Sequence, residues 1–305
     1  MKIAGPWTIS LIDKGPQYQW LDGGRRLHLQ HGPIDLVIEA VGEPEEMAKA
    51  YKQAHETFQA VLTGLVAELD YLRCPLTENS MAPEGLVARR MYHAALKYMR
   101  LDRITPMVAV AGSVADHVLQ AMLRSSSLVR AYVNNGGDIA LWLAPDESFT
   151  VGVCENPDTG HMGAHVCINA QDEVRGIATS GWRGRSHSLG IADAVTVLAA
   201  SAADADTAAT LIANAVDVPG SPLIHREPAC NLSPESDLGD RLVTVAVDTL
   251  AASDVAHALD GGRSVAERLI SMQGLSAAYI SLMGSTIVCE RNSTKQTLRA
   301  GAMHA

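Results

Sequence analysis

The stretch VRAYVNNGGDIALWL, residues 129–143, contains the pattern that decides the fold. Two apolar runs, 129–133 and 139–143, flank the polar turn NNGGD at 134–138. Asn-Gly and Gly-Gly pairs allow the positive φ angles of a two-residue turn, so the pattern predicts a tight β-hairpin. The same turn offers backbone N–H groups to an anion, so a ligand-facing turn is the alternative interpretation. Its candidate ligand residues are Asn134, Asn135, Gly136, Gly137 and Asp138.

Further short strands are predicted on both sides of this hairpin. Apolar and polar residues alternate in short runs, and longer runs have apolar residues at helical spacing. The predicted strands cover 34–41, 149–153, 165–168, 174–178, 193–198, 242–247 and 277–289. The predicted helices cover 43–71, 84–99, 108–123, 202–216 and 253–272. Neighbouring strands joined by short turns predict an α+β fold with a largely antiparallel sheet and packed helices.

The composition is that of a globular protein with an aliphatic core. Hydrophobic residues make up 47% of the 305 residues and aromatic residues only 4%. This balance excludes a disordered or collagen-like chain. The length predicts a single domain, 1–305, and the alternative is two subdomains, 1–103 and 104–305.

The net charge and the cysteine spacing argue against several kinds of binding partner and site. With 24 basic and 34 acidic residues the formal charge is −10, which argues against binding to nucleic acid. The first residues lack an apolar segment of signal-peptide length, and no run approaches 18 apolar residues, so no membrane partner is expected. The five cysteines form no Cys-x-x-Cys pair, which fits reduced thiols better than disulfides or zinc. We therefore expect a cytoplasmic protein.

A loop rich in hydroxyl groups, glycine and arginine follows the predicted strand at 174–178. Residues 176–188 read GIATSGWRGRSHS. In an acidic chain this loop is a local positive patch, which suits a phosphate, a carboxylate or another small anion. A solvated loop with the tryptophan packed down is the alternative. The candidate catalytic residues are Thr179, Ser180 and His187, the last as a general acid or base. The candidate binding residues are Gly181, Arg183 and Arg185.

An acidic residue and a hydroxyl share one face of the helix predicted at 202–216. Asp206 and Thr210 are four positions apart, so their side chains lie one above the other. Carboxylate and hydroxyl oxygens are ligands that Mg²⁺ takes together with water and substrate phosphates. The alternative is an acid in the first helical turn and a surface threonine. Asp193 and Asp204 are competing candidates for the metal-binding role.

Over residues 105–216 the chain resembles the ApbE superfamily, flavin transferases that move FMN from FAD onto a protein threonine. Four motifs in order carry the resemblance: Gly112-x-x-x-Asp116, VNNGGDI at 133–139, ATSG at 178–181 with His187, and Ala205-Asp206 with Thr210. The resemblance implies a T-fold-related α+β architecture. It also implies that Asp206 and Thr210 hold Mg²⁺ beside the FAD diphosphate, while the Asn-Gly-Gly and Thr-Ser-Gly segments line the nucleotide site. Subunits that share sheets imply a homo-oligomer, such as a dimer.

The sequence also departs from the family pattern. The expected Asp-Pro is missing after His187, and Ala111 stands where the family has lysine. No counterpart of the flavin-contacting Met-Gly-Thr segment is found, and aromatic stacking partners are scarce. Three hypotheses follow. The first is an enzyme that acts on another small anionic molecule, carboxylated or phosphorylated. The second is a Mg²⁺-dependent FAD:protein FMN transferase. The third is a non-catalytic protein that binds flavin, nucleotide or a small anion.

Overall fold

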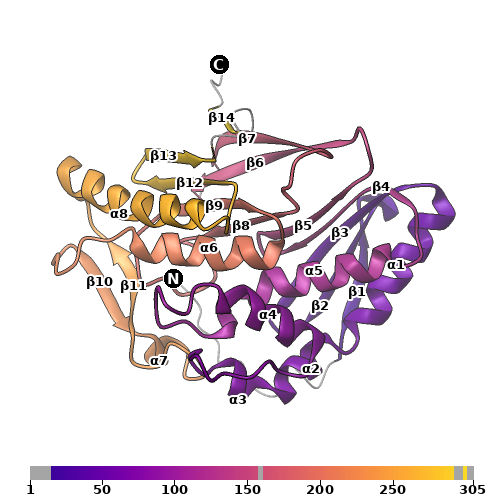
Figure 1. Ribbon diagram of the computed structural model, residues 1–305, viewed down its shortest axis with the longest axis horizontal. Helices are drawn as coiled ribbons and strands as arrows, with labels where there is room; N and C mark the ends of the chain where they lie inside the picture. Colours follow the sequence, from indigo (N-terminus) through magenta and orange to yellow (C-terminus); the bar gives the residue numbers. More distant parts are fainter. Residues whose placement is uncertain (1–14, 157–160, 292–297, 301–305) are drawn as a thin grey trace.

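In the computed structural model, which describes residues 15–156, 161–291 and 298–300, a nine-stranded sheet organises the chain. Its strand order is β1-β2-β3-β4-β5-β8-β9-β12-β13, and every pair is antiparallel. The strands are β1 (Gln17–Leu21), β2 (Arg26–His31), β3 (Ile34–Gly42), β4 (Leu128–Asn135), β5 (Asp138–Leu143), β8 (Gly176–Ser180), β9 (Ala194–Ala199), β12 (Ala277–Leu282) and β13 (Ser285–Glu290). The predicted α+β class and antiparallel sheet are confirmed (Figure 1).

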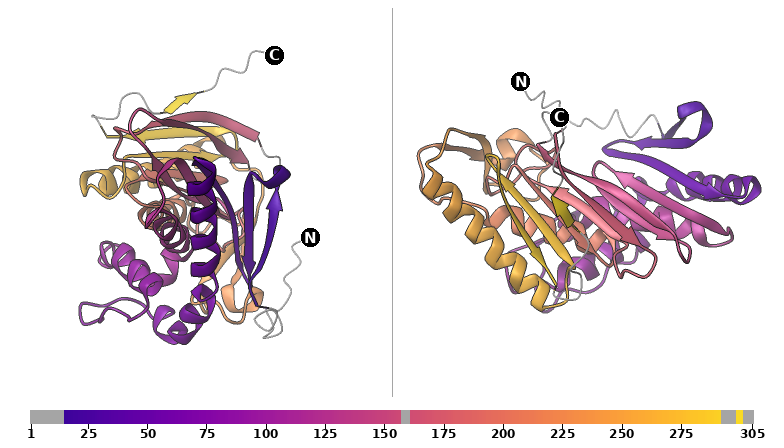
Figure 2. Two further views of the ribbon diagram at one scale, coloured as in Figure 1. Left: turned by 90° about the vertical axis from the view of Figure 1, so that its right-hand side faces the viewer. Right: turned by 90° about the horizontal axis from the view of Figure 1, so that it is seen from above.

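Two smaller sheets and a layer of helices complete the fold. The smaller sheets pair β10 (Ile224–Pro228) with β11 (Leu242–Val247), and β6 (Ser148–Asn156) with β7 (His161–Asn169) and β14 (Leu298–Ala300). The helices are α1 (Pro44–Phe58), α2 (Val61–Ala67), α3 (Leu69–Leu72), α4 (Leu86–Leu96), α5 (Val110–Leu123), α6 (Ala202–Ala215), α7 (Ala229–Leu232) and α8 (Ala252–Ser271), with short 3₁₀ turns η2 (Asp22–Gly24) and η3 (Pro106–Ala109). The sheet fans from β1 at one end to β13 at the other (Figure 2).

The helices cover one face of the large sheet, and the β6–β7 hairpin packs on the other. Helices α5 and α6 contact each other and lie nearly end to end across the middle of the helical layer (Figure 1). On the opposite face, Val153, Val166 and Ile168 of the hairpin form a hydrophobic cluster with Leu198 and Tyr279 of the large sheet. Residues of both predicted subdomains therefore form one continuous sheet between these two layers.

Periodicity predicted most elements, but the helix expected over 43–71 is wrong. The structure breaks it into α1, α2 and α3. Phe58 at the end of α1 and Leu62 and Leu65 in α2 are buried in the same core cluster. A straight helix of that length would extend about 43 Å, so the breaks let the chain turn and keep its apolar side chains on the core.

Two other expectations also need correction. The segment with Pro222 and Pro228, interpreted as a loop, contains β10, where Pro228 ends the strand opposite Leu242. Proline is tolerated there because this two-stranded sheet leaves outward-facing N–H groups unpaired. The strand predicted at 277–289 is a hairpin, turned at Met283 and Gly284 with φ of 48° and 76°.

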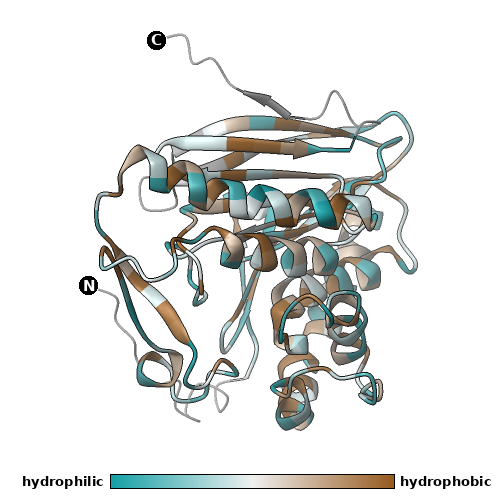
Figure 3. Cartoon of the chain, turned by 60° about the vertical axis from the view of Figure 1, so that its left-hand side comes forward, coloured by the Kyte–Doolittle hydropathy of each residue, from teal (hydrophilic) through white to brown (hydrophobic). Residues whose placement is uncertain are grey.

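Hydropathy separates the buried and exposed sides of the helices. In α8 the buried residues Val255, Leu259, Ala266 and Leu269 recur at helical spacing. Figure 3 shows hydrophilic and hydrophobic residues alternating around this helix. The stretch Pro106–Leu123 has the length and apolar character of a membrane span, but 56% of it is buried inside the fold. Its hydrophobicity is explained by the contacts of α5 with α1, α4 and α6.

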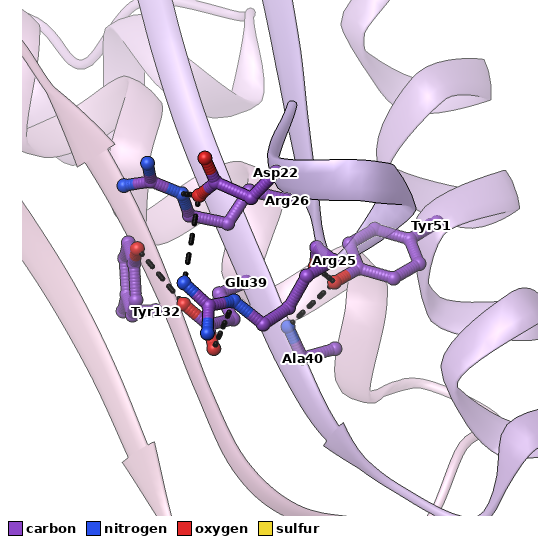
Figure 4. A network of polar contacts seen from close by, with 7 residues as sticks. All are labelled: Asp22, Arg25, Arg26, Glu39, Ala40, Tyr51 and Tyr132. Carbon is purple, nitrogen blue, oxygen red and sulfur yellow. Dashed lines mark hydrogen bonds and ion pairs between the residues drawn. The ribbon is translucent and has the colours of Figure 1, made fainter. Parts of the chain in front are cut away.

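A polar network fastens the β1–β2 turn to the sheet and to α1 (Figure 4). The hydroxyl of Tyr51 accepts a hydrogen bond from the Ala40 N–H at 2.9 Å and donates to the Arg25 carbonyl at 2.7 Å. The Tyr132 hydroxyl donates to the Glu39 carboxylate at 3.2 Å, and the Arg25 guanidinium lies 3.8 Å from the same carboxylate. These contacts hold strands β2, β3 and β4 in register at the N-terminal end of the sheet.

Candidate functional site

A cavity of about 1380 Å³ opens where the β4–β5 turn, the loop after β8 and the two central helices meet. Its walls include most of the residues that the sequence singles out. The lining includes Asn135, Gly136, Gly137, Asp138, Thr179, Ser180, Gly181, Arg183, Arg185, His187, Asp206 and Thr210. Motifs that are up to 75 positions apart in the chain (135 to 210) therefore share one cavity.

The β4–β5 turn is both a tight hairpin and a wall of the cavity. Gly136 and Gly137 have φ of 65° and 115°, the left-handed region that a two-residue hairpin turn requires. The Gly137 N–H donates to the Asn134 side-chain oxygen at 2.9 Å. Asn134 is used inside the turn and is not among the lining residues, whereas the two glycines face the cavity.

Asn135 connects this turn to the start of α5. Its side chain is buried, and its Nδ2 donates to the Ala111 carbonyl at 3.1 Å. Its Oδ1 accepts from the Asp35 N–H at 3.4 Å. The first turn of α5 is therefore held beside the end of β4, which brings the helix N-terminus to the cavity.

Two carboxylates, those of Asp138 and Asp206, interact inside the cavity. Burial, followed by the charge of Asp206, raises the pKa of Asp138 well above its ordinary value, although a hydrogen bond from the Thr179 N–H opposes the shift. Burial also raises the pKa of Asp206, opposed by the N–H groups of Gly112 and Ala111. No described lysine, arginine or histidine contributes to either shift. Two like charges with little solvent make a site that favours a proton or a cation.

Helices α5 and α6 cap each other, which fixes Asp206. Its Oδ2 accepts from the Gly112 N–H in the first turn of α5 at 3.0 Å. In return, the Asp116 carboxylate of α5 accepts from the N–H groups of Ala202 and Ala203 at 3.1 and 3.0 Å. Carboxylates at helix N-termini are favoured by the free N–H groups and the helix dipole. The Gly-x-x-x-Asp and Ala-Asp-x-x-x-Thr motifs are therefore two halves of one helix junction.

Removing the Asp116 cap is expected to destabilise the protein. Asp116→Ala would leave the N–H groups of Ala202 and Ala203 without their acceptor in a buried junction, lowering the free energy of unfolding by about 2 kcal/mol or more. Ser201→Ala, which removes one hydrogen bond to the Asp204 N–H at the same helix start, should cost only about 1 kcal/mol. Urea unfolding measures both. Equal losses for the two variants would contradict this role of Asp116.

Several hydroxyl residues line the same cavity as the two carboxylates. Thr210 lies one turn beyond Asp206 on α6 and lines the cavity. The Thr179 hydroxyl is 2.8 Å from that of Thr196 on β9, so these two hydroxyls hydrogen-bond to each other. Ser180 lines the cavity at the end of β8. The described residues contain no group of three or more His, Cys, Asp or Glu side chains able to hold a metal. A cation here would therefore be held by two carboxylates, a hydroxyl, and water or ligand.

The loop after β8 enters the cavity at Gly181, a position that no other residue type fits. Gly181 has φ of 153°, and an added Cβ would lie 2.6 Å from the Asp193 carbonyl oxygen. The Nε of Arg183 donates to the Asp193 carboxylate at 2.6 Å, and its guanidinium stacks on the Trp182 ring at 4.5 Å. Arg185 is exposed on the cavity wall and His187 lines the same wall. The loop is therefore ordered by packing, and the tryptophan is part of that order.

Some lining residues had no signal in the sequence. Thr105 donates from its hydroxyl to the Asp237 carboxylate, and the segment Ser236–Arg241 forms a further wall. Arg241 is tied to the Arg103 carbonyl at 3.1 Å. These contacts join parts of the chain more than 130 positions apart. Asp193 was only a competing metal ligand by sequence, and it pairs with Arg183 here.

Curated relatives of the chain include UPF0280 proteins of several Methano- species. The UPF0280 protein of Methanosarcina acetivorans is 34% identical over 192 residues, covering 60% of this chain and 70% of the relative. That of Methanosphaerula palustris is 37% identical over 194 residues, covering 63% and 77%. For Methanococcus vannielii the identity is 40% over 114 residues, and the match spans 36% of this chain and only 45% of that protein.

The other comparisons concern a solved structure and a family. The crystal structure of the ApbE protein from Thermotoga maritima aligns with a TM-score of 0.38 and 15% identity, covering 94% of this chain and 81% of that chain. A family model described as AbpE bacteria matches residues 18–288. Because this match takes in most of the chain, the ApbE-like resemblance is confirmed, and the chain belongs to the AbpE bacteria family.

Proposed function

We propose that this protein is an enzyme that binds a small anionic molecule, phosphorylated or carboxylated, with the help of a divalent cation on Asp138, Asp206 and Thr210. The observation that carries the proposal is the pair of carboxylates in the cavity: burial raises the pKa of both, and the charge of Asp206 raises the pKa of Asp138 further. A cation would relieve that repulsion. The hydroxyl-rich, arginine-containing loop beside the pair suits an anion.

The residues present fit magnesium. Carboxylate and hydroxyl oxygens are hard ligands, and Mg²⁺ commonly uses one or two carboxylates while keeping water or substrate phosphate oxygens. Asp206 is already fixed by the Gly112 N–H at 3.0 Å, and Asp138 by the Thr179 N–H. Such supported ligands change little on binding. When bound, the ion supplies charge neutralisation and polarisation of a phosphate or carboxylate oxygen.

The chain's own residues would divide the remaining work. The Gly136-Gly137 turn lines the cavity with backbone and has no side chains of its own. His187 lines the same cavity and would give a proton to, or accept one from, an oxygen of the ligand. Because the Thr179 hydroxyl hydrogen-bonds to that of Thr196, it supports the pairing of β8 with β9. The Ser180 hydroxyl is therefore the better placed of the two to meet a ligand. The reaction class that this set serves is group transfer to, or hydrolysis at, an anionic centre.

A second candidate, FMN transfer from FAD, is favoured by the size of the cavity. Its volume of about 1380 Å³ exceeds the range of roughly 300–1,000 Å³ that holds most small ligands. A dinucleotide would use that space, and its diphosphate would meet the proposed cation. Because the chain belongs to an ApbE-like family, FAD is the first dinucleotide to test.

A thermal-shift panel separates the two candidates. The protein is heated alone, with Mg²⁺, with inorganic pyrophosphate or FAD, and with each pair, because a ligand of the native state raises the Tm by mass action. Stabilisation by Mg²⁺ and pyrophosphate together, above either alone, is the expected result. Stabilisation by FAD with Mg²⁺ would select the transferase. A Tm that none of these mixtures raises would reject the proposed function.

A further inference from the structure

We propose that Arg185 is the residue that contacts the anion, whereas Arg183 is a positioning residue that orders the loop through Asp193. The inference rests on the proposed function, because it assigns roles within the same anion site. By sequence the two arginines are equivalent candidates. The structure separates them by what each guanidinium already contacts.

Arg183 has its charge balanced inside the protein. Its Nε donates to Asp193 Oδ1 at 2.6 Å, and the Asp193 side chain is only 9% exposed. The other oxygen of Asp193 accepts from the Met283 N–H at 2.5 Å, in the β12–β13 turn. The guanidinium of Arg183 also stacks on Trp182 at 4.5 Å. Removing Arg183, whose side chain is 27% exposed, would leave the nearly buried Asp193 carboxylate without its counter-charge, which is costly, so Arg183 is committed to the fold.

The backbone around Arg183 is fixed by the same neighbours. The Trp182 N–H donates to the Ala192 carbonyl at 3.0 Å, and the Gly184 N–H donates to the Gly181 carbonyl at 3.1 Å. The Asp193 N–H donates to the Ser281 carbonyl at 2.9 Å. The loop is thus hydrogen-bonded to the residues just before β9, and these are hydrogen-bonded in turn to β12. The residue that leaves this anchored part of the loop next is Arg185.

Arg185 is presented to the cavity. It is exposed, it lines the cavity, and its guanidinium makes no ion pair or hydrogen bond with the described residues. A Cβ added to Gly136 would lie 3.6 Å from its Nη1, so the guanidinium lies over the Gly136-Gly137 turn that leads into Asp138. An anion held by a cation on Asp138 would lie between that cation and the Arg185 guanidinium. Guanidinium groups bind phosphate and carboxylate strongly.

Other arginines on the cavity wall do not share this arrangement. Arg73 pairs with Glu235 at 2.9 Å, and Arg241 lies 3.6 Å from Asp102. Arg103 is exposed and lines the cavity, but it comes from the segment before η3. Arg103→Ala therefore removes one positive charge from the cavity wall without touching the loop, and it serves as the matched control.

The experiment is calorimetric titration of inorganic pyrophosphate into the Mg²⁺-saturated protein. Arg185→Ala is expected to weaken binding at least tenfold, with the Tm and Mg²⁺ binding unchanged, while Arg185→Lys recovers part of the loss. Arg103→Ala should change the affinity less than threefold. Arg183→Ala should lower the Tm and also weaken binding, because Arg185 loses its support, and Arg183→Lys, which can pair with Asp193, should recover both.

A double variant distinguishes positioning from contact. If Arg183 acts through Arg185, then Arg183→Ala costs no further affinity in a chain that already carries Arg185→Ala. Additive losses, or unchanged binding in Arg185→Ala, would overturn the assignment while leaving the proposed function standing. A wild-type protein that takes up no pyrophosphate would reject the proposed function and this inference with it.

Discussion

Asp206→Asn is expected to stabilise the metal-free protein at neutral pH and to abolish its stabilisation by Mg²⁺. The variant removes a charge that is enclosed beside Asp138, and burial raises the pKa of both groups. Because each carboxyl holds its proton more tightly in the folded than in the unfolded state, folding takes up protons. The wild type therefore loses stability as pH rises above about 4 and through the raised native pKa.

The difference in free energy of unfolding between Asp206→Asn and the wild type should therefore grow as the pH rises. At about pH 2, well below the unfolded pKa of an aspartate, both carboxyls are protonated in the folded and the unfolded state, and the variant should gain little. By pH 8 the gain should reach about 2 kcal/mol or more, since each unit of pKa difference corresponds to about 1.4 kcal/mol. Urea unfolding across pH, without metal, measures it. With Mg²⁺ the order reverses, because only the wild type has both carboxylates for the ion.

Asp204→Asn is the matched control for this experiment. Asp204 lies two positions earlier on α6, and its carboxylate pairs with Lys97 at 2.6 Å outside the cavity. Its replacement should cost less than about 1 kcal/mol and leave the Mg²⁺ response intact. A metal-free Asp206→Asn protein that is less stable than the wild type at pH 8 would show that the carboxylate is not under strain, contrary to this account.

Gly112→Ala is expected to have the largest effect on folding. A Cβ at this position would lie 2.2 Å from the Ala202 carbonyl oxygen and 2.7 Å from the Ala203 nitrogen. Both neighbours are backbone of α6, so neither can rotate away. The two helices would have to separate, which also pulls the Gly112 N–H from Asp206 and Asp116 from its two N–H donors. We expect a loss of about 3 kcal/mol or more in the free energy of unfolding.

Gly64→Ala provides the control in an open place. Gly64 lies in α2, and an added Cβ there would meet nothing within 4 Å. Alanine is the better helix former, so this variant should gain about 0.5–1 kcal/mol. Chemical unfolding of both variants makes the comparison. A Gly112→Ala protein as stable as Gly64→Ala would mean that the α5–α6 junction is looser than the structure has it.

Much of the fold could be predicted because local pattern and tertiary structure agree. Two apolar runs on either side of an Asn-Gly-Gly turn predicted the β4–β5 hairpin, and Gly136 and Gly137 have the positive φ angles that such a turn requires. The continuous helix over 43–71 could not be excluded locally. Its apolar spacing persists across the breaks, and only the position of the core, which Phe58 and Leu62 share, makes the chain turn. The turn at Met283 was missed because a non-glycine residue adopts positive φ there.

The site was predictable as a set of motifs but not as a geometry. The residues of the turn, the loop and α6 were found by residue type and by family resemblance, and most line one cavity. The interaction of Asp138 with Asp206 joins positions 68 apart in sequence (138 to 206), and no local signal pairs them. Nor does the sequence reveal that Asp193 neutralises Arg183 and leaves Arg185 facing the cavity. Those distinctions come from packing between distant segments.

The central claim is that Asp138, Asp206 and Thr210 together hold a divalent cation. The most direct test is a titration with Mn²⁺, which takes the same oxygen ligands as Mg²⁺. Binding is measured as the loss of the free-ion signal in electron paramagnetic resonance. The wild type is expected to take up one ion per chain, and to bind it more tightly with pyrophosphate present. Asp138→Asn and Asp206→Asn are each expected to take up none. Asp204→Asn should bind the ion as the wild type does. A wild-type protein that binds no Mn²⁺ with or without pyrophosphate, or an Asp206→Asn protein that binds it equally well, would contradict the account.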